Sequence, residues 1–403
     1  MTAEQQFFIR ILADHIHGRP SVPHTDKLNW ETLALYAEEQ AMPGLVYIQT
    51  RDFLKEHSDT APDVTRQLHK GFQSDIFLYA NRAAELNAFA QQCEGMPLVL
   101  MKGSVVQNYY PVPALRSMGD IDVIIHTEDR QKTDAIMLSD GYNKMVDNHA
   151  VWTYDKDHIE FEIHDHMFYE YLANDVDYRG YFDRIWEHVH LLEGTKNIYV
   201  PEENFHFLFL MTHLAKHITN NGMGFRAFLD LVFVIRSAGD RMDWQWIESE
   251  LEKLKLLEFT KTCFAFCRRW FDVQMPLASV ELDMDFYTEI TAKMFNDGMF
   301  GLINEQNEAA HSAKEIKRSK HTYWVTATKL TLHRLFPAYR DMQLVPWYRF
   351  VDGRPWLLPA AWVYRWFYTA THKFQKSKDL LIEPYCKREI INKRKKMISD
   401  WGL

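Results

Sequence analysis

The chain has 403 residues, of which 47% are hydrophobic and 25% are charged, so we expect an ordinary globular protein of two or three packed units. Its net charge of -9 argues against a protein that coats nucleic acid, because phosphate binding requires a basic surface. Four cysteines are too few for a disulfide scaffold, and no stretch reaches the roughly 20 uninterrupted apolar residues that cross a bilayer, so we expect a cytoplasmic protein without stable membrane insertion.

Helical patterns dominate the first 94 residues. Apolar residues recur at three- and four-residue spacing in 30–40 and again in 75–93. The run 98–101 is short and fully apolar, which is typical of a buried strand, and helical spacing returns over 104–110. The segment Lys102-Gly103-Ser104 therefore lies at a predicted strand-to-helix turn.

This turn has the features of a phosphate site. Gly103 lets the backbone approach a ligand closely, and the N-terminus of a helix offers free N–H groups to an anion. Ser104 adds a hydroxyl group. Lys102 is either a phosphate contact or a solvated lysine.

The next predicted strand carries two carboxylates on one face. Side chains alternate along a strand, so Asp120 and Asp122 project to one face. Val123 and Ile125 point to the opposite face, into a core. Unit charges ~4 Å apart repel by about 4 kcal/mol at an effective dielectric of ~20, so such a pair takes up a proton or binds a cation. Close-set carboxylates are the usual ligands of Mg²⁺ beside a phosphate.

A hairpin is predicted from strands at 151–155 and 158–167. In the second strand, four ionisable residues share one face: Glu160, Glu162, His164 and His166. If this strand lies beside the Asp-x-Asp strand, a glutamate completes a three-carboxylate cluster for two Mg²⁺ ions, and we favour the central Glu162. The two histidines orient acids or touch a phosphate; their spacing also permits zinc, although no cysteine partners them.

The predicted fold is α+β: a small mixed sheet with flanking helices, between N-terminal and C-terminal helical regions. Pro201 opens a long helical region with a turn at 220–222. We expect a helical region at 1–85, the sheet-containing core at 86–200, a helical domain at 201–345 and an aromatic and basic helical segment at 346–403.

Together these motifs resemble the bacterial uncharacterised nucleotidyltransferase family of the DNA polymerase beta-like superfamily. The resemblance rests on Lys102-Gly103-Ser104, Tyr110-Pro111, Arg116, Gly119-Asp120-Ile121-Asp122, Gly141-Tyr142 and Glu162-Ile163-His164. It extends to Trp30, His213-x-x-x-His217, Arg226-x-x-x-Asp230, Phe336-Pro337 and Trp356-Leu357-Leu358-Pro359.

The resemblance implies transfer of a nucleoside monophosphate from an NTP such as ATP to a hydroxyl group, with release of pyrophosphate. Gly103 and Ser104 would hold the β- and γ-phosphates, and Asp120, Asp122 and Glu162 would bind two Mg²⁺ or Mn²⁺ ions. Two features depart from the superfamily pattern. Fifteen residues separate Ser104 from Asp120, which is a long spacing, and the third acid is Glu where Asp is usual.

Other residues have both a functional and a structural interpretation. Arg116 either neutralises triphosphate charge or is a surface arginine. His213 and His217 lie one helical turn apart and form a structural pair or contact the acceptor; Leu214 excludes an HExxH zinc site.

Arg226 and Asp230 are most simply an i, i+4 ion pair, and otherwise contact the acceptor or the base.

The last part of the chain is rich in aromatic and basic residues. Nine Lys and Arg against four Asp and Glu in 372–403 indicate a solvated terminal helix, or a contact with an acidic or nucleic-acid partner. The aromatic cluster comprises Trp347, Tyr348, Trp356, Trp362, Trp366 and Phe367. It is typical of a core or an interface, and a peripheral membrane contact lacks a basic amphipathic pattern there.

Three functions remain open. The first is a metal-dependent nucleotidyltransferase whose acceptor is a small molecule, a protein or an RNA. The second is a toxin-like or antibiotic-modifying transferase with the same chemistry. The third is a non-catalytic nucleotide-binding or scaffold protein, which the long spacing and Glu162 favour. Acceptor, preferred base and oligomeric state are not encoded in any motif.

Overall fold

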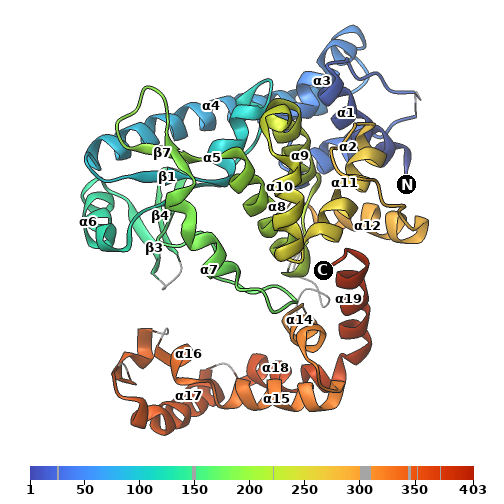
Figure 1. The fold of residues 1–403 in the computed structure, drawn as a ribbon. Coiled ribbons are helices and arrows are strands. Elements are labelled where there is room, and N and C mark those ends of the chain that lie inside the picture. Colours follow the sequence, from blue (N-terminus) through green and yellow to red (C-terminus); the bar gives the residue numbers. More distant parts are fainter. Residues whose placement is uncertain are drawn as a thin grey trace.

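The computed structural model describes residues 1–24, 27–147, 151–220, 222–299, 310–343, 346–351, 353–372 and 374–403 (Figure 1). Within them lies one seven-stranded sheet in the order β3-β4-β5-β2-β1-β7-β6. The strands are β1 (Leu98–Leu100), β2 (Asp120–Ile124), β3 (Asn143–Asp147), β4 (Trp152–Lys156), β5 (Ile159–His164), β6 (Val189–Leu191) and β7 (Ile198–Pro201). The pairs β2–β5 and β1–β7 are parallel and the others antiparallel, which makes the sheet mixed.

Helices precede, flank and follow this sheet, so the predicted α+β fold is confirmed. They are α1 (Ala3–His17), α2 (Trp30–Glu39), α3 (Pro43–Glu56), α4 (Pro62–Gln92), α5 (Lys102–Val106), α6 (Arg130–Ser139), α7 (Tyr178–Phe182), α8 (Glu203–Asn220), α9 (Phe225–Ala238), α10 (Trp244–Lys253), α11 (Leu257–Phe271), α12 (Met284–Asp297), α14 (Ala310–Arg318), α15 (Tyr323–Leu335), α16 (Tyr339–Gln343), α17 (Leu358–His372), α18 (Phe374–Cys386) and α19 (Arg388–Asp400). Short 3-10 turns lie at 107–109, 113–115, 127–129, 183–187, 239–241, 346–351 and 355–357.

The predicted hairpin is present as β4 and β5, which pair from Trp152↔Ile163 to Lys156↔Ile159. Asp157 and His158 close it in the left-handed region, with φ of 52° and 68°. Strands β3, β6 and β7 were not predicted. Strand β3 is polar and mostly exposed, while β6 and β7 have only three and four residues, so none shows a clear apolar pattern.

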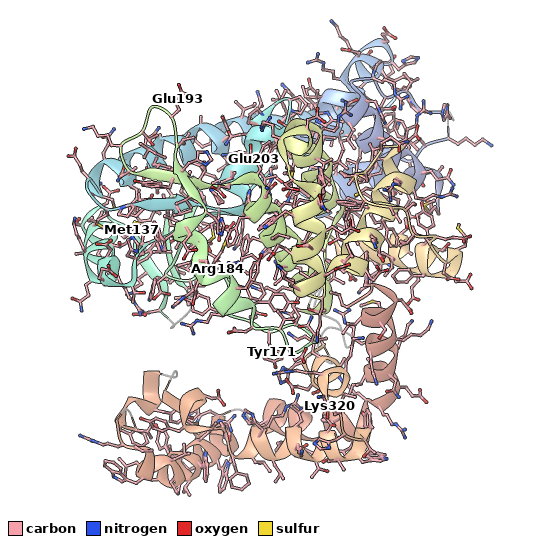
Figure 2. All side chains as sticks on the ribbon, viewed as in Figure 1. Met137, Tyr171, Arg184, Glu193, Glu203 and Lys320 are labelled. Atoms are coloured by element: carbon pink, nitrogen blue, oxygen red, sulfur yellow. The ribbon has the colours of Figure 1, made fainter. Side chains whose placement is uncertain are left out.

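The two faces of the central strands enter different cores. On one face, Val123, Phe161 and Ile163 pack in a cluster with Phe89 of α4 and Met137 of α6; Figure 2 labels Met137 on α6, next to the sheet. On the other face, Val99 and Ile124 join a larger cluster that includes the apolar residues of α8 and α9. Because the polar side chains of β2 and β5 also project to this second face, they lie between the sheet and the helices.

The larger core joins regions that are far apart in the sequence. It includes Phe8 of α1, Leu45 of α3, Phe209 of α8 and Trp401 at the end of the chain. The predicted helical region after the sheet is present, although Pro201 is the last residue of β7 and α8 begins at Glu203. Asn221, in the predicted turn, lies outside the described residues. The domain boundaries stay a prediction.

The C-terminal arm, defined as residues 323–386 with α15 to α18, is set apart from the sheet and its helices (Figure 1). Helices α14 and α19 connect it to the rest of the chain. Tyr171, labelled beside α14 in Figure 2, lies under the cations of Lys314 and Arg318, each 5.1 Å from the ring centroid.

The basic C-terminal helix is not the solvated helix that its charge predicts. Arg394 of α19 is 1% exposed and donates hydrogen bonds to the carbonyl oxygens of Ile218 and Asn220. Ile391 and Ile398 are buried beside it. The helix therefore docks through one face, while Lys393 and Lys396 stay exposed.

A search of the described residues found no helix with the length and apolar character needed to cross a membrane.

Candidate active site

The strand pairing that the predicted acid cluster requires is present. Strands β2 and β5 are parallel neighbours, with Asp122 opposite Glu162 and Asp120 opposite Glu160. Residues directly opposite each other on paired strands project to the same face. Asp120, Asp122 and Glu162 therefore share the face that looks toward α8 and α9.

Three of these side chains form a compact set of donor atoms. One donor atom each from Asp122, Glu162 and His164 lies within 4.8 Å of the others. The His164 Nε2 atom is 3.0 Å from Asp122 Oδ1 and 3.5 Å from Glu162 Oε2. The Asp122 side chain is 2% exposed and that of Glu162 is 27% exposed, so the cluster opens to solvent on the Glu162 side. Asp120 lies beside this group rather than within it.

Lys102 supplies positive charge to the cluster. Its Nζ atom lies 2.5 Å from Asp122 Oδ1 and 3.8 Å from Glu162 Oε2. Burial disfavours the ammonium, but the charges of Asp122, Asp120 and Glu162 outweigh that effect and raise the pKa of Lys102. Lys102 is therefore not a solvated lysine, and its contact with a phosphate stays a prediction.

The two aspartates differ in protonation. Burial opposes ionisation of Asp122, yet Lys102 and His164 outweigh burial and hold the pKa of this carboxyl well below its usual value. Burial, followed by the charge of Asp122, raises the pKa of Asp120 to about 6. One carboxylate thus stays ionised near neutral pH, while the other can exchange a proton there.

The predicted turn after β1 is closely packed. A Cβ atom on Gly103 would lie 2.5 Å from Met118 Sδ and 2.8 Å from the Arg116 NH1 atom, so only glycine fits this position without movement. Ser104 is 5% exposed, and its hydroxyl contacts the Met118 sulfur at 4.0 Å. The contact of Gly103 and Ser104 with phosphates stays a prediction.

Arg116 is buried, so the surface interpretation of this arginine is wrong. Its Nε atom donates to Asp230 Oδ1 at 2.8 Å and its NH2 atom to Asp230 Oδ2 at 2.7 Å. The Tyr110 hydroxyl donates to Asp230 Oδ1 at 2.7 Å. The two hydrogen bonds from Arg116 to Asp230 fix the guanidinium so that its NH1 atom lies beside Gly103.

The simplest expectation for Arg226, an ion pair with Asp230, is also wrong. Arg226 NH1 instead donates to the carbonyl oxygen of Ser117 at 2.8 Å, at the start of the segment that leads into β2. The Asp230 carboxylate is already held by Arg116 and Tyr110, whose planar and hydroxyl donors reach both of its oxygens. The tertiary pair therefore replaces the local one.

His213 and His217 of α8 lie near the cluster. Their Nε2 atoms are 3.1 Å apart, which agrees with the predicted structural pair. Burial, then the His217 and Lys102 charges, holds the pKa of His213 well below its usual value. Burial likewise lowers the pKa of His217 to about 4. Both rings are thus neutral near pH 7.

For several residues, the structure and the sequence-based prediction of the site differ. His166 is separate from the cluster, with its Nδ1 atom 2.6 Å from Asp183 Oδ1, so the structure does not join it to His164 in a zinc site. Arg82 of α4, whose charge acts on Asp120, and Met118 had no signal in the sequence, because each reaches the site only through tertiary packing. His164 could have been found as a donor from its alternation with Glu162.

Comparisons with known proteins give the family. A model described as "Uncharacterised nucleotidyltransferase" matches residues 26–272, which is more than half of the chain. The motifs at Phe336-Pro337 and Trp356–Pro359 lie outside the matched residues, so their part in the resemblance stays a prediction, as does bacterial origin. Neither a search of curated proteins nor a search of solved structures found a match. The chain belongs to the uncharacterised nucleotidyltransferase family.

Proposed function

We propose that the protein transfers a nucleoside monophosphate from an NTP to a hydroxyl group, in a reaction that depends on Mg²⁺ or Mn²⁺. The observation that carries this proposal is the convergence of Asp122, Glu162 and His164 on the shared face of β2 and β5. Family membership supports the reaction class. The acceptor is a small molecule, a protein or an RNA.

The donor set suits a divalent cation. Two carboxylates and an imidazole lie within 4.8 Å of one another, and the ammonium of Lys102 already rests against them. Asp122, Glu162 and His164 would hold one ion, and Asp120 with Asp122 would hold a second. Divalent ions in such sites neutralise the triphosphate and acidify an attacking hydroxyl.

The surrounding residues would bind the triphosphate and move the proton. Gly103 and Ser104 would contact the phosphates, and the Arg116 guanidinium beside Gly103 would supply positive charge. A carboxylate oxygen of Asp120 that is not bound to an ion would accept the proton of the acceptor hydroxyl. The hydroxyl oxygen then bonds to the α-phosphorus, and the bond from that phosphorus to the bridging oxygen breaks. Pyrophosphate leaves with the electron pair.

His164 bears on the choice of metal. Mg²⁺ prefers an all-oxygen environment, whereas imidazole is a usual ligand of transition-metal ions. We therefore expect this protein to bind Mn²⁺ more tightly than Mg²⁺, and His164→Asp to reduce that preference. Manganese electron paramagnetic resonance measures this binding without a need for turnover.

The first experiment is calorimetric titration of ATP, GTP, CTP and UTP, with and without Mg²⁺ or Mn²⁺. Metal-dependent binding of at least one nucleotide is expected, and Asp122→Asn should abolish it. Asp157→Asn is the matched control, because Asp157 lies in the exposed turn of the same hairpin at a φ of 52°, which asparagine tolerates. Absence of binding in the wild type would mean that the acids are structural.

A non-catalytic nucleotide-binding protein is the second candidate. The close contact of Lys102 with Asp122 favours it, because the ammonium lies against the carboxylate that a catalytic metal ion would need. Labelled NTP offered with RNA, protein and aminoglycoside acceptors separates these functions. Transfer to one class supports an enzyme, including a toxin-like or antibiotic-modifying one. Binding without transfer supports the second candidate.

A further inference from the structure

Helix α17 of the C-terminal arm exposes a continuous apolar face. The α17 face comprises Trp356, in the 3-10 turn before the helix, and Ala360, Val363, Tyr364 and Phe367. Three- and four-residue spacing places these side chains on one side of a helix. Trp356 is 71% exposed, Val363 61% and Phe367 70%, so large apolar groups meet solvent together.

The polarity of this helix is the reverse of that of a solvated surface helix. Arg365 is the one Lys, Arg, Asp or Glu between 358 and 372 in the sequence, and it points inward. Its NH1 atom donates to the carbonyl oxygen of Arg334 on α15 at 2.7 Å. Ala361, on the same side, is fully buried. The exposed side of α17 therefore carries no charged residue, whereas Arg365 lies on the opposite side, against α15.

We propose that the α17 face docks on the surface of a bilayer that contains anionic lipids. Contiguous exposed apolar patches mark protein or membrane contacts, and Trp and Tyr favour the membrane–water boundary, where one end of the side chain is apolar and the other wet. The proposal concerns peripheral docking and does not depend on the proposed function.

Charge identifies the lipid class. The arm has nine Lys and Arg against four Asp and Glu, a net charge of +5, within a chain whose net charge is -9. Arg354 and Lys378, both exposed, lie beyond the two ends of α17. Long cationic side chains at such positions reach lipid phosphates while their stems cover apolar surface.

A bilayer fits this face better than a second copy of the chain. Pairing of two α17 faces would bring together two arms of net charge +5, and like charges oppose association. Protein interfaces also carry about one hydrogen bond per 100–200 Å². The Trp356 indole and the Tyr364 hydroxyl are the two polar groups among the side chains of the α17 face, so the face offers little directional bonding.

The test is co-sedimentation of the full chain with phosphatidylcholine vesicles, with and without phosphatidylglycerol. The wild type should bind the anionic vesicles, and high salt should weaken this binding through screening. Trp356→Gln/Phe367→Gln should reduce partitioning more than about tenfold, because two large apolar side chains lose their burial. Phe77→Gln/Met145→Gln is the matched control, since both residues are 63% exposed but lie on α4 and β3. It should change partitioning less than about twofold.

A second variant tests the charge requirement separately. Arg354→Gln/Lys378→Gln changes exposed residues only, and it should remove the preference for anionic vesicles while retaining weak binding to neutral ones. The proposal is overturned if the wild type stays in solution with both vesicles, or if the control variant loses as much binding as the α17 variant. It is also overturned if light scattering shows a wild-type dimer that Trp356→Gln/Phe367→Gln dissociates, because the α17 face would then bind a second copy.

Discussion

The polar face of β2 and β5 and the α17 face both reverse the usual distribution of side chains in a soluble protein. On the sheet, the ionised Asp122 is 2% exposed, within a network that includes Lys102 and His164. On the arm, Trp356 and Phe367 are at least 70% exposed. Buried charge and exposed apolar surface both cost free energy, so each requires compensation, from a partner within the chain or outside it.

The two regions differ in how the protein compensates this cost. Each buried charge near the sheet has a partner within the chain: Asp122 has Lys102, and Arg116 has Asp230. The α17 face has little such compensation, because among the described residues only Tyr364 makes an aromatic contact there, with Tyr348 at 6.1 Å. Substitutions in the first region should therefore change folding stability, whereas those in the second should change binding.

The largest effect is expected at the Arg116–Asp230 pair. Asp230→Ala leaves a buried guanidinium without its carboxylate and should lower the free energy of unfolding by about 3–5 kcal/mol in urea titration. Glu203→Ala is the control, because its partner Arg241 is 60% exposed and such pairs contribute at most about 1 kcal/mol. Arg116→Met/Asp230→Leu should recover much of the loss. Equal losses for both single variants would remove the contrast between buried and exposed pairs.

Buried neutral histidine should give the next effect. Burial, then the charge of Arg116, lowers the pKa of His206 to about 4 from its usual 6.5. Its contribution to stability is thus fully present above pH 6.5 and is lost as the pH falls through about 4. His206→Phe should reduce this acid-induced loss by about 3 kcal/mol, measured as unfolding free energy against pH. His57→Gln, at an exposed position, should leave the profile unchanged.

Gly103→Ala should cost about 1–3 kcal/mol of stability, because its Cβ would overlap Met118 and the Arg116 guanidinium. Under the proposed function it should also weaken nucleotide binding. Gly119→Ala provides the control, at the start of the neighbouring strand β2, since a Cβ there meets nothing within 4 Å. Thermal unfolding and nucleotide titration of the two variants distinguish local crowding from general sensitivity. Equal behaviour would contradict close packing at the turn.

The smallest effect on stability should come from the α17 face. Trp356→Gln/Phe367→Gln should change the free energy of unfolding by less than about 0.5 kcal/mol for each residue, because neither side chain is buried by folding. Urea titration measures this change. A loss of several kcal/mol would show that the two side chains pack within the protein, and the contrast between the regions would then fail.

Much of the candidate site follows from local sequence patterns. Strand alternation placed Asp120 and Asp122 on one face of β2, and Glu162 and His164 on one face of β5. The β4–β5 hairpin followed from two alternating runs of residues. The predicted strand-to-helix transition at Lys102-Gly103-Ser104 is also present, because β1 ends at Leu100 and α5 begins at Lys102. These features depend on residues two to four apart, whose geometry the backbone period determines.

Only the tertiary structure decided which distant groups meet. The register of β2 against β5 placed Glu162 opposite Asp122. The packing of α9 brought Asp230 into an ion pair with Arg116 instead of with Arg226. The same holds for α17, whose sequence contains the aromatic residues but not the direction in which each points. Local periodicity divides a helix or strand into faces, whereas the choice of the face that becomes buried depends on long-range packing. The sequence by itself therefore determined the chemistry and the faces of these elements, and the tertiary structure decided their partners.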